Sequence, residues 1–286
     1  MQKVSCFVAI VILSVTVYTQ SNSAGKAIDL NNLGVDKMLG GRQDAALGDF
    51  RSAVELWPGC LKCRYNLART LTKTGEAAEA IKIFEGLLIE KPDFGDAYSG
   101  LGDALTESGR PEDSLAAYNA ALKLNPNDAV TLTNLGNSLE QLKKHDEALT
   151  ALDKAVKLDP NLAGAHSNRG TTLYSLKRVK EAAESFRRSI ELDPNSPETL
   201  NNLGVALDAL GKKGTQKYFE QALRLKPDWG FPVYNLALVN LKRGERDAAR
   251  VGLASLERLD MGLADTLRKH LWSKYVVEVP LRTSRG

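Results

Sequence analysis

Two groups of residues have types and a spacing that suit chemistry. Cys60 and Cys63 are spaced C-x-x-C and follow directly on Pro58-Gly59, where a helix is expected to begin. The second group consists of asparagines that recur at intervals of 33 or 34 residues, or of twice 34: Asn32, Asn66, Asn134, Asn168, Asn202 and Asn235. The cysteines suit disulfide chemistry, and the asparagines suit hydrogen bonding to a polypeptide backbone.

The cysteine pair is expected to form a structural disulfide. One helical turn brings the two Cα atoms to a distance that a disulfide tolerates, provided that the protein reaches an oxidising compartment. The alternative is a redox-active pair, because a helix N-terminus lowers a thiol pKa, although no thioredoxin-like strand-helix-strand pattern surrounds it. Arg64 stands where covalent haem attachment requires histidine, and no second Cys or His pair completes a zinc site. Since the histidines are scattered singly (His145, His166, His270), neither a metal nor another cofactor is expected.

The asparagine row has two interpretations. One side-chain amide offers both a donor and an acceptor, so a row of them can hold the backbone of an extended peptide without reading its sequence. Alternatively, the same amides bond to neighbouring helices of the protein itself. Asparagine is a mediocre helix former, so helix propensity does not explain its recurrence.

A fixed period organises the elements that position these residues. Prolines recur at intervals of 34, 34, 34, 34 and 33 residues, at Pro58, Pro92, Pro126, Pro160, Pro194 and Pro227. Such a period predicts an array of identical helical hairpins. Glycine recurs in the expected turn between the two helices of a unit, where it reaches the left-handed conformation at little cost. Lys143 and Lys177 replace this glycine in two units, whose turns are expected to be strained or differently shaped.

The pattern of small, aromatic and Leu-Gly or Leu-Ala positions around each proline resembles the tetratricopeptide repeat family. The resemblance covers Ala27 to about Met261 and implies an all-α, right-handed superhelical solenoid of seven helix-turn-helix repeats. The repeat domain, residues 27–262, divides into 27–60, 61–94, 95–128, 129–162, 163–196, 197–229 and 230–262. A basic amphipathic segment, 263–275, is expected to form a capping helix, and 276–286 a tail. Repeat six has lost a residue between Gly211 and Gln216, which predicts a local register adjustment.

In this family the first helix of each repeat lines the concave face, so its polar positions form the expected binding surface. The asparagine row resembles the asparagine ladder of the O-linked N-acetylglucosamine transferases, at its six positions only. Tyr65 is a candidate stacking surface, as are Tyr174 and Tyr234. Asn137 belongs to a neutral, polar stretch after repeat three, which also suits a glycan.

Charge distinguishes repeats two and three. Lys62, Arg69 and Lys73 occupy the same repeat positions as Asp96, Asp103 and Glu107. We expect these residues to neutralise one another as an ion-pair ladder; the alternative is a polarised site for a partner that carries both charges. The net charge of the chain is only +3, with both signs interspersed, so no nucleic acid partner is expected.

The N-terminus predicts export. Met1–Lys3 carries a positive charge, Val4–Tyr18 is apolar, and small and polar residues follow up to Ala24. This pattern predicts a signal peptide over 1–24, cleaved after Ser23 or Ala24, and a periplasmic or secreted protein without a stable membrane span. The alternative is an uncleaved anchor, although the apolar run is shorter than the roughly twenty residues of a span.

The sequence therefore predicts a non-enzymatic interaction scaffold that binds an extended protein or peptide segment in its concave groove. The candidate contacts are Asn32, Asn66, Asn134, Asn168, Asn202, Asn235, Asn137, Tyr65 and Arg69. Two alternatives come from other classes: an envelope thiol-disulfide partner acting through Cys60 and Cys63, and an envelope glycan-binding module. The sequence names no particular partner and no oligomeric state.

Overall fold

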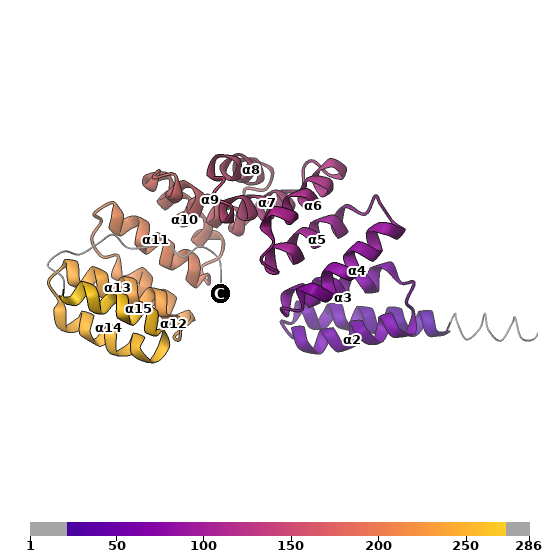
Figure 1. Cartoon of the computed structure of the whole chain (residues 1–286), viewed down its shortest axis with the longest axis horizontal. Helices are drawn as coiled ribbons and strands as arrows, with labels where there is room; N and C mark the ends of the chain where they lie inside the picture. The colour runs from indigo at the N-terminus through magenta and orange to yellow at the C-terminus, as the bar shows by residue number, and fades with distance from the viewer. Residues whose placement is uncertain (1–21, 273–286) are drawn as a thin grey trace, which may run out of the picture. The chain divides into compact units, whose positions relative to one another are not determined.

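A computed structural model of the protein describes residues 22–272, and all regular structure in these residues is helical (Figure 1). A first helix covers residues 22–39. It is followed by α2 (Gln43–Leu56), α3 (Leu61–Lys73), α4 (Ala77–Glu90), α5 (Gly95–Glu107), α6 (Pro111–Leu124), α7 (Ala129–Gln141), α8 (His145–Leu158), α9 (Ala163–Ser175), α10 (Val179–Leu192), α11 (Pro197–Ala209), α12 (Gln216–Leu225), α13 (Gly230–Lys242), α14 (Arg246–Leu259) and α15 (Met261–Trp272). The prediction of an all-α repeat protein is confirmed.

The contacts divide the chain into two compact units, Met1–Pro126 and Asn127–Gly286. The division falls at the end of the third predicted repeat. Within each unit, the second helices α4, α8, α10 and α12 each pack against the first helix of their own repeat and against the first helix that follows. First helices also contact the next first helix, as α3 does α5 and α9 does α11, whereas none of the described second helices contacts another second helix. The first helices are therefore the more closely spaced layer, and we call the surface that they form the first-helix face.

Small residues let the two helices of a repeat approach. A Cβ atom built on Gly102 would lie 2.5 Å from the ring of Tyr118, and one on Gly170 would lie 2.6 Å from the ring of Phe186. Both rings are fully buried, with at most 1% of their surface exposed. Real Cβ contacts are not this short, so glycine is the residue that these contacts require.

The turns between helices keep one conformation whether or not they contain glycine. Gly41, Gly75 and Gly109 have φ angles of 72°, 88° and 76°, and Lys143 and Lys177 have 59° and 62°. The two lysines thus adopt the left-handed conformation of the glycines that they replace, so these turns are strained and not differently shaped. A side chain in this region costs about 1–2 kcal/mol.

The expected adjustment in repeat six lies at the start of its second helix. Helix α12 begins only at Gln216 and has 10 residues, where α8, α10 and α14 have 14. Gly214, just before it, has a φ of 74°. The loss of one residue is thus accommodated by a shorter α12, whose first turn is not helical.

The last helix, α15, covers the end of the second unit. It packs on α13 and α14 through Ala264, Leu267 and Leu271, which are buried. Arg268 bonds to Glu257 of α14 at 2.7 Å. Helix α15 thus caps the array as expected, although it begins at Met261, before the predicted segment 263–275.

The predicted tail, 276–286, and most of the predicted signal peptide, 1–24, lie outside the described residues. Ser23 and Ala24, the predicted cleavage positions, belong to the helix over residues 22–39. Among the helices that the structure describes, none is both long and apolar enough to cross a membrane.

Candidate functional site

Cys60 and Cys63 form a disulfide at the start of α3. The two sulfur atoms are 2.01 Å apart and the two Cα atoms 5.3 Å apart. Cys60 is also the N-cap of α3, and its Sγ accepts a hydrogen bond from the Cys63 N–H at 3.1 Å. Only 6% of Cys60 and 1% of Cys63 are exposed, and both pack against Ala27 and Ala53. Burial shelters the bond from attack by another thiolate, which thiol-disulfide exchange requires.

The asparagine row is half-exposed in the first unit. Asn32 is exposed, and Asn66 is half-buried. The amide of Asn66 donates to Oδ1 of Asn31 at 2.9 Å, and Asn31 is only 2% exposed. Asn66 therefore joins α3 to the preceding first helix and still borders the first-helix face.

The asparagines of the row differ in burial in the second unit. Asn134, Asn137 and Asn168 are half-buried, but Asn202 is 5% exposed and Asn235 is fully buried. The amide of Asn235 donates to Oδ1 of Asn201 at 2.8 Å, and Asn201 donates to Asn202 at 3.2 Å. This burial contradicts the expectation that Asn202 and Asn235 contact a peptide. Asn235 joins α13 to α11, which is the alternative role of the row, and Asn202 bonds to its neighbour Asn201 within α11.

The one gap in the row has a packing cause. Where the other repeats have asparagine, repeat three has Gly100, and a Cβ atom there would lie 2.5 Å from the ring of Phe84. Phe84 is fully buried and lies edge-on to Tyr65, with the ring centres 6.1 Å apart. The aromatic cluster thus excludes any side chain at this position.

The charges of repeats two and three lie on α3 and α5. Among the ion pairs of the described residues, none joins the three basic residues of α3 to the three acidic residues of α5. The Arg69 guanidinium lies 5.5 Å from the centre of the Tyr65 ring. Asp103 accepts a hydrogen bond from the hydroxyl of Tyr118 at 2.8 Å. The expected ion-pair ladder has therefore not formed.

Tyr65 lies between the two sets of charges. Burial raises the pKa of its phenol above the usual value of 10.0, and the nearby carboxylates of Asp96 and Asp103 add to the shift. The positive charge of Arg69 opposes it. Charges of both signs therefore act on this phenol.

A hollow of about 190 Å³ lies beside this surface, between the helix over residues 22–39 and α3. Its walls combine apolar and basic side chains: Val35, Met38, Leu39, Phe50, Asn66, Arg69, Thr70 and Lys73. It has room for one side chain of a ligand, with Asn66 and two cations at its rim.

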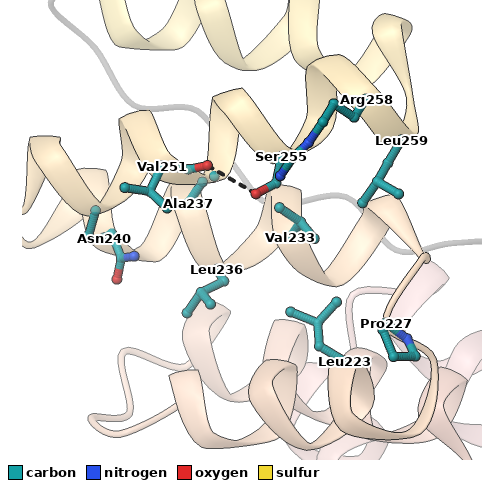
Figure 2. Close-up of a pocket in the computed structure, with 12 residues that line it drawn as sticks. Leu223, Pro227, Val233, Leu236, Ala237, Asn240, Val251, Ser255, Arg258 and Leu259 are labelled. Carbon is teal, nitrogen blue, oxygen red and sulfur yellow. Dashed lines mark hydrogen bonds between the residues drawn. The ribbon is translucent and has the colours of Figure 1, made fainter.

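A second hollow, of about 500 Å³, lies in the second unit between α12, α13 and α14 (Figure 2). Its lining is mostly aliphatic: Leu223, Pro227, Val233, Leu236, Ala237, Asn240, Ala248, Val251, Gly252, Ser255, Arg258 and Leu259. Its volume is in the range of ligand-binding clefts. No residue of the asparagine row lines it.

The family follows from sequence comparison. A profile of the tetratricopeptide repeat matches residues 32–93, 65–129 and 133–197, and a second one matches 185–217. Together they cover more than half of the chain. The chain belongs to the tetratricopeptide repeat family. No curated protein matches it in sequence.

Solved tetratricopeptide repeat structures share the fold. A thermophilic one from Thermus thermophilus is 25% identical, with a TM-score of 0.58 over 63% of this chain and 98% of its own. One from Parabacteroides merdae is 17% identical, with a TM-score of 0.63 over 87% of this chain and 100% of its own. A chain of the APC/C hetero-tetramer Cut9–Hcn1 is 18% identical, with a TM-score of 0.66 over 81% of this chain and 53% of its own. Tetratricopeptide repeat solenoids are generally non-enzymatic interaction scaffolds, and membership of the family supports an interaction scaffold as the functional class of the protein.

One polar cluster of this tetratricopeptide repeat protein was not anticipated from its sequence. Glu140 of α7 is 7% exposed; it accepts a hydrogen bond from the hydroxyl of Ser175 at 2.6 Å, and its other oxygen lies 2.9 Å from Nδ1 of His145. The carboxylate stands between the hydroxyl and the imidazole, whereas a nucleophilic serine needs the imidazole to take its proton. The cluster therefore joins α7, α8 and α9 and does not activate Ser175. Only the spacing of 35 residues between Glu140 and Ser175, about one repeat, could have indicated it.

Proposed function

We propose that the protein holds an extended segment of a partner protein against its first-helix face. The observation that carries this proposal is the set of unpaired charges in the first unit. Lys62, Arg69 and Lys73 are exposed on α3, Asp96 and Glu107 are exposed on the adjacent α5, and none of the five forms an ion pair with a described residue. Adjacent opposite charges that remain unpaired are available to a ligand that carries both signs.

Some charges of the second helices are paired within the protein. Arg51 of α2 bonds to Glu79 at 2.8 Å, and Arg64, which lies on the side of α3 that faces the second helices, bonds to Glu90 of α4 at 2.6 Å. Others, such as Lys82 and Glu85 of α4, form no ion pair with a described residue. The support for the first-helix face is therefore the arrangement of its charges, with basic residues on α3 beside acidic residues on α5.

The spacing of the helices suggests the charge pattern of the ligand. Packed helices lie about 8–10 Å apart, and an extended chain advances about 3.3 Å per residue. An acidic residue facing α3 and a basic residue facing α5 would therefore be about three residues apart. Exposed ion pairs contribute about 0–1 kcal/mol each, so the affinity is expected to be modest and to fall as salt is added.

The accessible asparagines of the first unit supply the remaining contacts. Asn32 and Asn66 border its first-helix face. Each amide that bonds to a peptide backbone contributes about 0.5–1.5 kcal/mol net. These contacts do not depend on the ligand's side chains, so the charges carry the selectivity.

The experiment is a selection of random 12-residue peptides on phage, followed by fluorescence anisotropy with the best peptide. We expect a consensus with an acidic and a basic residue about three positions apart. Replacing both Lys62 and Lys73 with Glu should weaken binding about tenfold or more, because it reverses the charge of α3. The matched control replaces Lys82 and Lys123, exposed on the second helices, with Glu. Equal loss in both variants, or no selected peptide, refutes the proposal.

We also propose that the protein acts outside the cytoplasm. The support is the sequence pattern of residues 1–24 together with a buried disulfide, a bond that persists mainly in oxidising compartments. N-terminal sequencing of the protein recovered from the exported fraction tests this. A mature chain that begins within a few residues of Ala24 is the expected result, and an intact Met1 in the cytoplasmic fraction contradicts it.

A further inference from the structure

The 500 Å³ hollow in the second unit, which we call the α12–α14 groove, shares no residue with the asparagine row. Helices α12 and α14 form its sides and α13 its floor. Figure 2 shows Arg258 and Leu259 at one end of the groove and Asn240 at the other. Val251, between the two ends, is 69% exposed although it is aliphatic. Exposed aliphatic surface around a concavity is typical of a binding site.

On the side that lines this groove, the sequence of α14 departs from that of α8 and α10, the other 14-residue second helices of the same unit. Its third, sixth and tenth residues are Ala248, Val251 and Ser255. The same positions carry mainly charged residues in α8 (Glu147, Thr150, Lys154) and in α10 (Glu181, Glu184, Arg188). Charged side chains keep the outer surface of a second helix solvated, whereas α14 leaves it apolar.

The charge at the rim is also unbalanced. Arg258 is exposed and forms no ion pair with any residue that the structure describes, whereas the neighbouring Glu257 bonds to Arg268 of α15. No acidic residue lines the groove. A ligand that brings a carboxylate to this end of the groove would neutralise Arg258.

We propose that the α12–α14 groove binds an amphipathic helix of a partner protein, with two apolar residues in the groove and an acidic residue at Arg258. A groove between two helices with a third as its floor accepts another helix by ridge-into-groove packing. Val251 and Arg258 are seven residues apart on α14, or about 10 Å along its axis. A helix lying along α14 matches this span with apolar residues at i and i+4 and a carboxylate at i+7.

The binding helix would occupy a surface that the peptide on the first-helix face does not use. The two sites take ligands of different chemistry: an extended segment with both charges in the first unit, and a helix with an apolar stripe and one acid in the second. A protein with both sites connects two partners.

The test uses three fluorescein-labelled, 15-residue helical peptides and fluorescence anisotropy with the full-length protein. The first peptide has Leu at positions 4 and 8 and Glu at position 11, the second has Lys at position 11, and the third has Ser in place of both Leu residues. The protein variants are Val251→Glu and Arg258→Glu. The matched control is Arg250→Glu, on the same helix but outside the groove and already paired with Asp247 at 3.0 Å.

We expect the first peptide alone to bind the unaltered protein well. Arg258→Glu should weaken the binding of this peptide roughly tenfold and transfer the preference to the Lys peptide. The affinity of Arg250→Glu for the first peptide should stay within about twofold of the parent's. Val251→Glu should abolish binding with an unchanged circular dichroism melting curve, because this side chain is largely exposed. The proposal is wrong if the first peptide does not bind saturably or if both arginine variants behave alike. It is equally wrong if sedimentation shows a dimer that Val251→Glu dissociates, since a second copy then fills the groove.

Discussion

Replacing Gly170 with alanine tests whether the close approach of the two helices in a repeat stabilises the solenoid. Gly170 lies inside α9, where alanine would favour the helix by about 0.5–1 kcal/mol. However, the new Cβ would lie 2.6 Å, 2.7 Å and 3.0 Å from three ring atoms of Phe186. Carbon atoms pack at about 3.5–4.0 Å, so the fully buried ring would have to retreat by roughly 1 Å.

The two effects have opposite signs, and the structure supplies a control that separates them. Overpacking of this kind costs about 1–3 kcal/mol, so Gly170→Ala should be destabilised by up to about 2 kcal/mol. Gly164, in the first turn of the same helix, has no foreign atom within 4 Å of a built Cβ. Gly164→Ala should therefore gain a few tenths of a kcal/mol, up to about 0.5.

The assay is urea unfolding followed by far-ultraviolet circular dichroism for the parent and both variants. The difference between the two variants should be about 1–3 kcal/mol, with Gly170→Ala the less stable. A second cycle with Phe186→Leu should show positive coupling, because a smaller side chain relieves the clash. Equal stability of Gly164→Ala and Gly170→Ala would refute the packing argument for every repeat.

Three further predictions concern the turns, the asparagines and Tyr65. Lys143→Gly should raise the free energy of unfolding by about 0.5–1 kcal/mol, since relief of 1–2 kcal/mol of strain outweighs the added freedom of the unfolded chain; an unchanged urea midpoint contradicts this, and Lys144→Gly, one residue on, is the control. Asn235→Ala should lower the free energy of unfolding by about 1–3 kcal/mol in the same assay, because it leaves the buried Oδ1 of Asn201 without its donor; Asn168→Ala should not lower it to this extent. Burial raises the pKa of Tyr65, so the folded state binds the phenol proton more tightly than the unfolded state does. The stability that protonated Tyr65 contributes is complete below pH 10.0 and is lost as the pH rises through the folded pKa. Phenolate absorbance of the parent and of Tyr65→Phe measures that pKa, and a value at or below 10.0 contradicts the prediction.

The fold was predictable because each repeat repeats the same physical requirements. Gly102 and Tyr118 could be paired in advance, since a small residue and a ring at fixed positions of the period must meet once the helices form a hairpin. The lysine turns were also recognisable, but whether Lys143 would keep the left-handed conformation or change the turn depends on how firmly the flanking helices hold it. The structure gives a φ of 59°, so the packing of α7 on α8 determines the conformation of the turn.

The candidate site was harder to predict, because one sequence position has different surroundings in different repeats. Asn168 and Asn235 occupy the same position, yet the first is half-buried and the second is fully buried. The residue one position earlier in the preceding repeat also differs: Asn201 accepts the amide of Asn235, whereas Thr133 stands in that place before Asn168 and directs its hydroxyl to the carbonyl of Ala129, 2.7 Å away. A row that is regular in sequence is therefore divided, by its neighbours, into amides that hold the solenoid together and amides that remain accessible. The same reasoning applies to the charges of α3 and α5, which match by position but form no ion pairs with each other: Arg69 lies over the Tyr65 ring, and Asp103 accepts a hydrogen bond from the hydroxyl of Tyr118.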